Sequence, residues 1–312
     1  MGLTVLLIEK IASFFLLILC GFLLSKLVIF DRMSAQVIAC ITVYATTPAM
    51  IINSFIVEYT QDRMHDFLAM MLFAIAVHII FFIVSNILGI FGKATNCDRA
   101  VLIFSNAASL VFALVDYVLG HEYTFYAVPY VLFQTVFFWT YGVVLLSKKE
   151  NISLKQILTS LPLIACFVGI TLFVLRIQIP TSIKATMDSL GSMNGTLSCL
   201  LAGIALGHID LRNVFCRKKV YILSTVRLLV LPVASIALLK LIRADSLVSI
   251  SILPMITVIA SAAPSGTLVN NLAEVNHSDP DGDIVAVISF TMITCIITIP
   301  MIAQIYQLIF NV

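Results

Sequence analysis

Two short stretches, Ser105-Asn106-Ala107-Ala108-Ser109 and Ala260-Ser261-Ala262-Ala263-Pro264, decide the fold of this 312-residue chain. They begin 155 positions apart, and each places small and polar side chains inside an otherwise apolar segment. The first is followed by Asp116 and a polar turn at 120–122, and the second by Asn271 and a polar pair at 276–277. This correspondence predicts a weak internal repeat.

The second stretch continues as Pro264-Ser265-Gly266, which removes one backbone donor and adds flexibility in mid-segment. In hydrocarbon every backbone N–H and C=O must be paired, because each missed group costs several kcal/mol. We therefore predict an interrupted helix whose freed groups face a cavity or another helix. The ends of such half-helices hold an anion or polarise a substrate. An ordinary proline kink packed by small residues is the alternative.

The composition places these stretches in a membrane. Of the residues, 61% are apolar and only 11% are charged, whereas an average soluble domain is about half apolar and a quarter charged. A soluble globule of this length needs more charge on its surface. The net charge of +2 is too small for a nucleic-acid partner. We therefore expect an all-α polytopic membrane protein whose surroundings are the lipid bilayer.

A bilayer core of about 30 Å requires roughly 20 helical residues. The sequence contains ten such segments, and no water-soluble domain fits between them. Their approximate ranges are 5–30, 35–56, 66–91, 99–119, 122–147, 156–176, 183–208, 219–242, 246–274 and 283–310.

The distribution of lysine and arginine predicts the orientation, because cytoplasmic loops carry an excess of both. With the N-terminus outside, the cytoplasmic loops hold eleven of the 18 basic residues and the outer loops hold six, while Arg227 lies inside a segment. We therefore expect a multi-pass protein of the cell membrane, plasma or inner, with both termini on the outer side.

The basic stretch at 148–155 divides the chain into two halves of five segments each. An odd number of spans inverts the second copy relative to the first, as in transporters built from inverted repeats. We predict one five-helix repeat over 1–150 and an inverted one over 151–312, with interruptions in the fourth and ninth helices.

Short motifs follow in a fixed order along nearly the whole chain. The first half contains Gly21 to Lys26, Asp31, Thr46-Thr47-Pro48 and Asn106. The second half contains Leu161-Pro162, Gly169, Ile179-Pro180, Leu190-Gly191, Gly203 to Gly207, Pro264 and Pro300. This order resembles the auxin efflux carrier family, which comprises the plant auxin exporters and their short bacterial relatives. Two motifs differ, since Thr196-Leu197-Ser198 replaces a proline and Phe112-Ala113-Leu114 replaces a glycine–proline pair.

The resemblance implies ten spans in two inverted repeats. It also implies a scaffold domain and a transport domain, each drawn from both repeats, which meet around the crossing fourth and ninth helices. The family moves small organic anions, so we expect a secondary transporter of a small carboxylate that works by alternating access. A homodimer formed through the scaffold is a further expectation.

Polar residues of the fourth segment are the first candidates for substrate binding. Asn106, Ser109 and Asp116 share one stripe of an unbroken helix, and a break near Ala108 would leave Asn106 at the break. An amide both donates and accepts hydrogen bonds, which suits a carboxylate, and the resemblance implies an asparagine here. Hydrogen bonding between helices, worth about 1 kcal/mol, is the alternative.

Matching places in the second and seventh segments hold further candidates for a polar lining. These are Thr46, Pro48 and Asn53, and in the seventh segment Asn194 and Ser198. Helix packing is the alternative for this set, and it is the preferred interpretation of Gly203-xxx-Gly207. The ninth segment adds Ser261, Pro264, Ser265 and Asn271.

Arg227 and Asp116 are candidate coupling or counter-charge residues. A buried arginine costs at least a few kcal/mol unless it is paired or wetted. Arg227 therefore either faces an anion or an acid, or extends its side chain to the inner headgroups.

The sequence lacks the residue patterns that metal sites and intramembrane enzymes require. The seven cysteines form no CxxC pair. The stretch Asp279-Pro-Asp281-Gly-Asp283 begins like a calcium loop but has Ile284 and Phe290 where that loop needs Gly and Glu. HExxH, GxSG with histidine and paired DxxD motifs are absent. We expect no enzyme activity, no metal and no cofactor.

Two related functions remain open. Carriers of the bile-acid or sodium symporter type have a similar ten-span architecture but need intramembrane sodium ligands, and apart from Asp116 the middles of the segments contain almost no carboxylates. Proton coupling or uniport is therefore favoured. A channel or sensor is the other alternative, because a gate needs no motif.

Overall fold

The structure is a computed structural model that describes residues 3–27, 32–92, 94–146, 159–207, 217–276 and 283–311. Within these ranges the regular structure is helical, apart from one isolated β-bridge. The basic stretch at 148–155 and residues 279–282 of the predicted acidic turn lie outside the described residues.

The first half of the chain forms helices at each of its five predicted segments. Helix α5 and helix α6 are separated by three residues, as the predicted interruption requires. The elements are α1 (Leu3–Leu27), α2 (Arg32–Ile41), the π-helical turn η1 (Thr42–Thr46), α3 (Thr47–Ser54), α4 (Gln61–Ile90), α5 (Asn96–Ile103), α6 (Ala107–Val118), η2 (His121–Ala127), α7 (Val128–Phe137), η3 (Phe138–Gly142) and α8 (Val143–Leu146).

The second half also has helices at its five predicted segments, and α15 and α16 are separated at the predicted proline. Its elements are α10 (Leu161–Val174), α11 (Thr181–Gly207), α13 (Lys218–Thr225), the π-helical turn η4 (Val226–Val230), α14 (Leu231–Leu241), η5 (Ala244–Ser246), α15 (Leu253–Ala262), α16 (Thr267–Asn276) and α17 (Asp283–Phe310).

Five helices of the described residues are long and apolar enough to cross a membrane by length and composition. They cover Val37–Ser54, Gln61–Ile90, His121–Leu146, Lys218–Leu241 and Asp283–Phe310. Shorter apolar helices cover Ala12–Lys26, Leu161–Val174 and Leu253–Ala262. The chain is therefore an all-helical membrane protein with several spans.

Two of the π-helical turns have a local cause. Each lies just before a proline, with Tyr44 four residues before Pro48 and Leu228 four residues before Pro232. Proline has no N–H and its ring clashes with the carbonyl four residues earlier. A wider turn relieves that clash, so the helix continues past the proline without a break.

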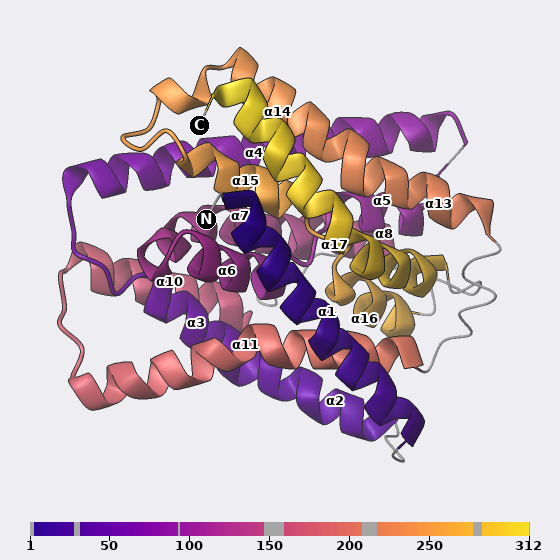
Figure 1. Cartoon of the computed structure of the whole chain (residues 1–312), viewed down its shortest axis with the longest axis horizontal. Coiled ribbons are helices and arrows are strands. Elements are labelled where there is room, and N and C mark those ends of the chain that lie inside the picture. The colour runs from indigo at the N-terminus through magenta and orange to yellow at the C-terminus, as the bar shows by residue number, and fades with distance from the viewer. Residues whose placement is uncertain are drawn as a thin grey trace.

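The helices divide into two groups according to their main packing partners. The first group contains α1, α2–α3, α10 and α11, and the second contains α4, α5–α6, η2–α8, α13–α14, α15–α16 and α17. In Figure 1, α2, α3, α10 and α11 occupy the lower part, while α4, α13, α14 and α15 occupy the upper part. Helix α1 crosses the front of the molecule. Each group contains helices from both halves of the sequence.

The closest packing in the first group is between α1 and α11, because glycines bring the two backbones together. A Cβ atom added at Gly203 would lie 2.0 Å from the carbonyl oxygen of Ile18, and one at Gly21 would lie 2.2 Å from that of Leu200. A Cβ at Gly207 would overlap the side chain of Ser25. The packing interpretation of Gly203-xxx-Gly207 is therefore confirmed.

We predict that Gly203→Leu weakens this contact by about 2 kcal/mol or more, because the added side chain overlaps the backbone of α1. Thermal unfolding of the purified protein in detergent measures the loss. Ala185→Val enlarges an exposed position of the same helix and is expected to leave the unfolding temperature nearly unchanged. Equal unfolding temperatures for both variants would contradict the close approach.

Candidate functional site

The two interrupted helices cross at their breaks. Ser105, between α5 and α6, and Ser265, between α15 and α16, form an isolated antiparallel β-bridge. The Asn106 N–H donates to the Pro264 carbonyl at 2.8 Å, and the Gly266 N–H donates to the Phe104 carbonyl at 2.9 Å. The break comes slightly earlier than the expected position near Ala108. Each break therefore pairs backbone groups that the other break has freed.

The crossing leaves little room for a side chain at Gly266. A Cβ atom there would lie 3.0 Å from the Ser105 carbonyl oxygen. Ala263, which precedes Pro264, is extended with φ −61° and ψ 149°, as a residue before proline prefers. The proline ends α15, and the glycine lets the segment Phe104–Asn106 approach. Pro264-Ser265-Gly266 therefore forms one side of the bridge.

A glutamine from α7 pairs the remaining backbone groups of the first break. Gln134 Oε1 accepts from the Ser105 N–H at 3.1 Å and from its hydroxyl at 2.7 Å, and Gln134 Nε2 donates to the Ser105 carbonyl at 2.8 Å. Ser105 is buried. The side-chain amide thus replaces both partners that an intact helix would have supplied.

Side chains from other helices pair the backbone of the second break. The Ser265 N–H donates to the Thr291 hydroxyl of α17 at 3.2 Å, and the Ser265 hydroxyl donates to the Val101 carbonyl of α5 at 2.9 Å. Arg227 Nη1 donates to the Ser261 carbonyl, in the last turn of α15, at 2.8 Å. The breaks therefore depend on α7, α17 and η4.

Arg227 is completely buried inside the second group. Its guanidinium lies over the Phe81 ring, 5.3 Å from the centroid, and contacts no carboxylate of the described residues. Its Nε and Nη2 atoms find no hydrogen-bond partner there. The alternative that Arg227 extends to the headgroups is wrong, because its side chain turns into the protein and holds α15.

A pocket opens beside the crossing, between the two helix groups. It is partly open and is lined from α1, α6, α11 and α17. Its polar side chains include Asn106, whose side-chain amide forms no hydrogen bond within the described structure, and Ser198, whose buried hydroxyl finds no partner there. The other lining residues are Phe14, Phe15, Ile18, Leu110, Gly195, Cys199, Met292, Cys295, Ile296 and Ile299.

The remaining candidates of the second and seventh segments lie elsewhere. Asn194 is fully buried, and its Oδ1 accepts from the hydroxyls of Thr46 at 2.8 Å and Thr47 at 2.9 Å. These hydrogen bonds join α11 to the junction of η1 and α3. Pro48 is half-buried in the first turn of α3. Here the structure matches the packing alternative.

Asn53 and Asp116 belong to a polar chain at one end of the molecule, away from the crossing. Asn53 Nδ2 donates to Asp188 Oδ1 at 2.6 Å and lies 3.4 Å from His121 Nε2, while His121 Nδ1 lies 3.1 Å from Asp116 Oδ1. The Ser261 hydroxyl donates to the Val258 carbonyl. Ser109 and Asn271 belong to α6 and α16, and their side chains lie outside the described structure.

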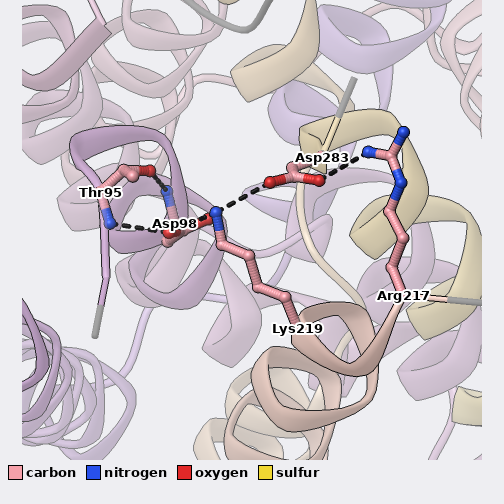
Figure 2. A network of polar contacts seen from close by, with 5 residues as sticks. All are labelled: Thr95, Asp98, Arg217, Lys219 and Asp283. Atoms are coloured by element: carbon pink, nitrogen blue, oxygen red, sulfur yellow. Dashed lines mark hydrogen bonds and ion pairs between the residues drawn. The ribbon is translucent and has the colours of Figure 1, made fainter. Parts of the chain in front are cut away.

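A charged network joins the starts of three helices of the second group (Figure 2). Lys219 at the start of α13 lies between Asp98 of α5, at 2.9 Å, and Asp283 of α17, at 2.8 Å. Arg217 pairs with the other oxygen of Asp283 at 2.7 Å. Asp98 also accepts from the Thr95 N–H, which completes a capping box on α5. Asp283 therefore has two basic partners, both from the start of α13.

A sequence model of the family described as membrane transport protein matches residues 6–158. This match over the first half of the chain supports an auxin efflux carrier-like membrane transporter. The matched region contains most of α1 and every element from α2 to α8, and therefore the first interrupted helix and Gln134. No curated protein matches the chain at a significant level.

We predict that Gln134→Leu destabilises the transporter by about 2–4 kcal/mol, because it leaves the buried N–H and C=O of Ser105 without partners. Thermal unfolding in detergent measures the loss. Gln61→Leu makes the same change at an exposed position of α4 and is expected to have little effect. A Gln134→Leu variant as stable as Gln61→Leu would show that the break does not need the amide.

We also predict that Lys219→Met lowers stability by about 1–3 kcal/mol, because Asp98 is buried and loses its cation. Lys218→Met is the matched control, since Lys218 is adjacent and exposed. The difference in unfolding temperature between the two variants, compared at low and high salt, measures the contribution of the network. An identical temperature for both would reject that contribution.

Proposed function

We propose that this membrane transporter is a secondary carrier that moves a small organic anion, such as a carboxylate, by alternating access around the crossing of α5–α6 and α15–α16. The observation that carries the proposal is the pocket beside the crossing. It lies between two helix groups, and two of its polar side chains, Asn106 and Ser198, have no hydrogen-bond partner within the described structure. Such groups are available to a substrate.

The chemistry of the pocket supports a carboxylate. Asn106 precedes the first turn of α6, so the partial positive charge and free N–H groups of this helix start lie beside the pocket. The amide of Asn106 and the hydroxyl of Ser198 both donate hydrogen bonds. The apolar lining accepts a hydrocarbon or aromatic body, as small-molecule sites generally do.

In this proposal the two helix groups move relative to each other. The first group is the scaffold and the second is the transport domain, each drawn from the inverted repeats at 1–150 and 151–312. The matching breaks of α5–α6 and α15–α16, and their antiparallel pairing, support this symmetry. The proposal also includes ten spans, both termini outside the cell membrane and a homodimer. The placement of the termini rests on the counts of basic residues, and the homodimer rests on the resemblance.

The other candidate residues receive secondary roles in this proposal. Ser109 and Asn271 are further substrate contacts, and Arg227 is a positioning residue that fixes α15. Ser261, Pro264 and Ser265 build the crossing, whereas Thr46, Pro48 and Asn194 belong to the packing of α11 against η1 and α3.

We predict that Asn106→Ala lowers carboxylate uptake into proteoliposomes at least about tenfold, since one hydrogen bond to a charged group contributes about 1.5–3 kcal/mol. A panel of radiolabelled mono- and dicarboxylates identifies the substrate, and uptake with and without sodium tests coupling. Asn96→Ala removes an exposed amide at the start of α5 and serves as the control. Normal flux in Asn106→Ala would remove Asn106 from the site, and currents far above carrier turnover would indicate a channel.

A further inference from the structure

A chain of four polar side chains links the two helix groups at one end of the molecule. It runs from Asp188 in α11 to Asn53 in α3, then to His121 at the start of η2 and Asp116 in α6. The first two belong to the first group and the last two to the second. The side chains of His121 and Asp116 are about half exposed, at 47% and 52%, so water reaches this junction.

The hydrogen-bond directions of this chain depend on the protonation of His121. An ionised carboxylate only accepts, so His121 Nδ1 carries the hydrogen that points to Asp116 Oδ1. A neutral imidazole then has a bare Nε2, which accepts from Asn53 Nδ2. The second hydrogen of Asn53 Nδ2 goes to Asp188 Oδ1. The observed arrangement therefore suits a neutral His121.

A proton on His121 would break this arrangement. Nε2–H would face Nδ2–H, which places two donors against each other. Rotation of the amide would turn Asn53 Oδ1 to the imidazolium, and this buried oxygen has no partner within the described structure at present. The same rotation would place Oδ1 against Asp188 Oδ1, so the hydrogen bond between Asn53 and Asp188 would be lost.

We propose that His121 is a proton-binding site at the boundary between the two helix groups, and that proton uptake loosens their contact at this end. This proposal rests on the proposed function, because it assigns a proton to the carrier's conformational change. Hydronium in the surrounding water gives up the proton, which forms an N–H bond at His121 Nε2 and leaves a water molecule, and no other covalent bond changes.

The charges around His121 decide how readily it takes up a proton. Asp116 on α6 and Asp188 on α11 attract the imidazolium, whereas Lys184 on α11 repels it. The neighbouring Glu122 is paired with Arg63 of α4 at 2.6 Å. Two carboxylates against one cation therefore favour the imidazolium over the neutral ring.

The experiment measures the distance between the two groups by pulsed electron paramagnetic resonance, without substrate. Spin labels are attached at Ser182 of α11 and Leu241 of α14, both exposed, in full-length protein whose native cysteines have been replaced. We expect the distance distribution to lengthen or broaden on going from about pH 8 to about pH 5. His121→Gln should abolish this change, because glutamine does not titrate in this range.

Two further variants complete the test. His65→Gln removes an exposed histidine of α4 and should keep the wild-type pH response. Asp188→Asn should move the midpoint to lower pH, because it removes one attracting charge, and this readout remains if His121→Gln does not fold.

A distribution that is independent of pH, or a pH response that persists in His121→Gln, would overturn the proton site. Because no substrate is used, carboxylate transport that proceeds normally alongside a pH-independent distance would reject the proton site alone. Absence of transport alongside a pH-dependent distance would reject only the proposed function.

Discussion

The structure depends on one constraint, which is that a helix interrupted inside a membrane must find new partners for its freed backbone groups. Here two interruptions satisfy each other. Phe104 and Asn106 exchange backbone hydrogen bonds with Gly266 and Pro264. Neither break has these partners alone, so the fourth and ninth predicted segments require each other, and the two halves of the chain form one helical body around their crossing.

The crossing also determines what the surrounding helices supply. Gln134 pairs both backbone groups of Ser105, while Thr291 and Arg227 pair groups at the second break. These side chains are polar in otherwise apolar helices because they complete the crossing. The pocket lies next to these paired groups, and the side chains of Asn106 and Ser198 remain without partners there. The polar groups that hold the crossing together and the polar side chains that are available to a substrate are therefore adjacent but distinct.

The two ends of the second group are held differently. At one end Asp98, Lys219, Asp283 and Arg217 tie α5, α13 and α17 to one another within the group. At the other end the chain from Asp188 to Asp116 links the second group to the first. An internal tie keeps a body rigid, whereas a link between bodies can open, and this difference agrees with movement of one group against the other.

The sequence alone predicted the membrane class, helices at the described parts of its apolar segments and the two interruptions, because apolar length and small, polar or proline residues are local properties. It did not reveal Gln134 and Thr291 as partners of the breaks, although each is a polar residue in an apolar segment. It also grouped Asn194 with Asn106 as pocket residues, whereas Asn194 is occupied by Thr46 and Thr47. Only the tertiary structure decided which polar groups are paired and which face the pocket, because hydrogen-bond partners come from helices distant in the chain.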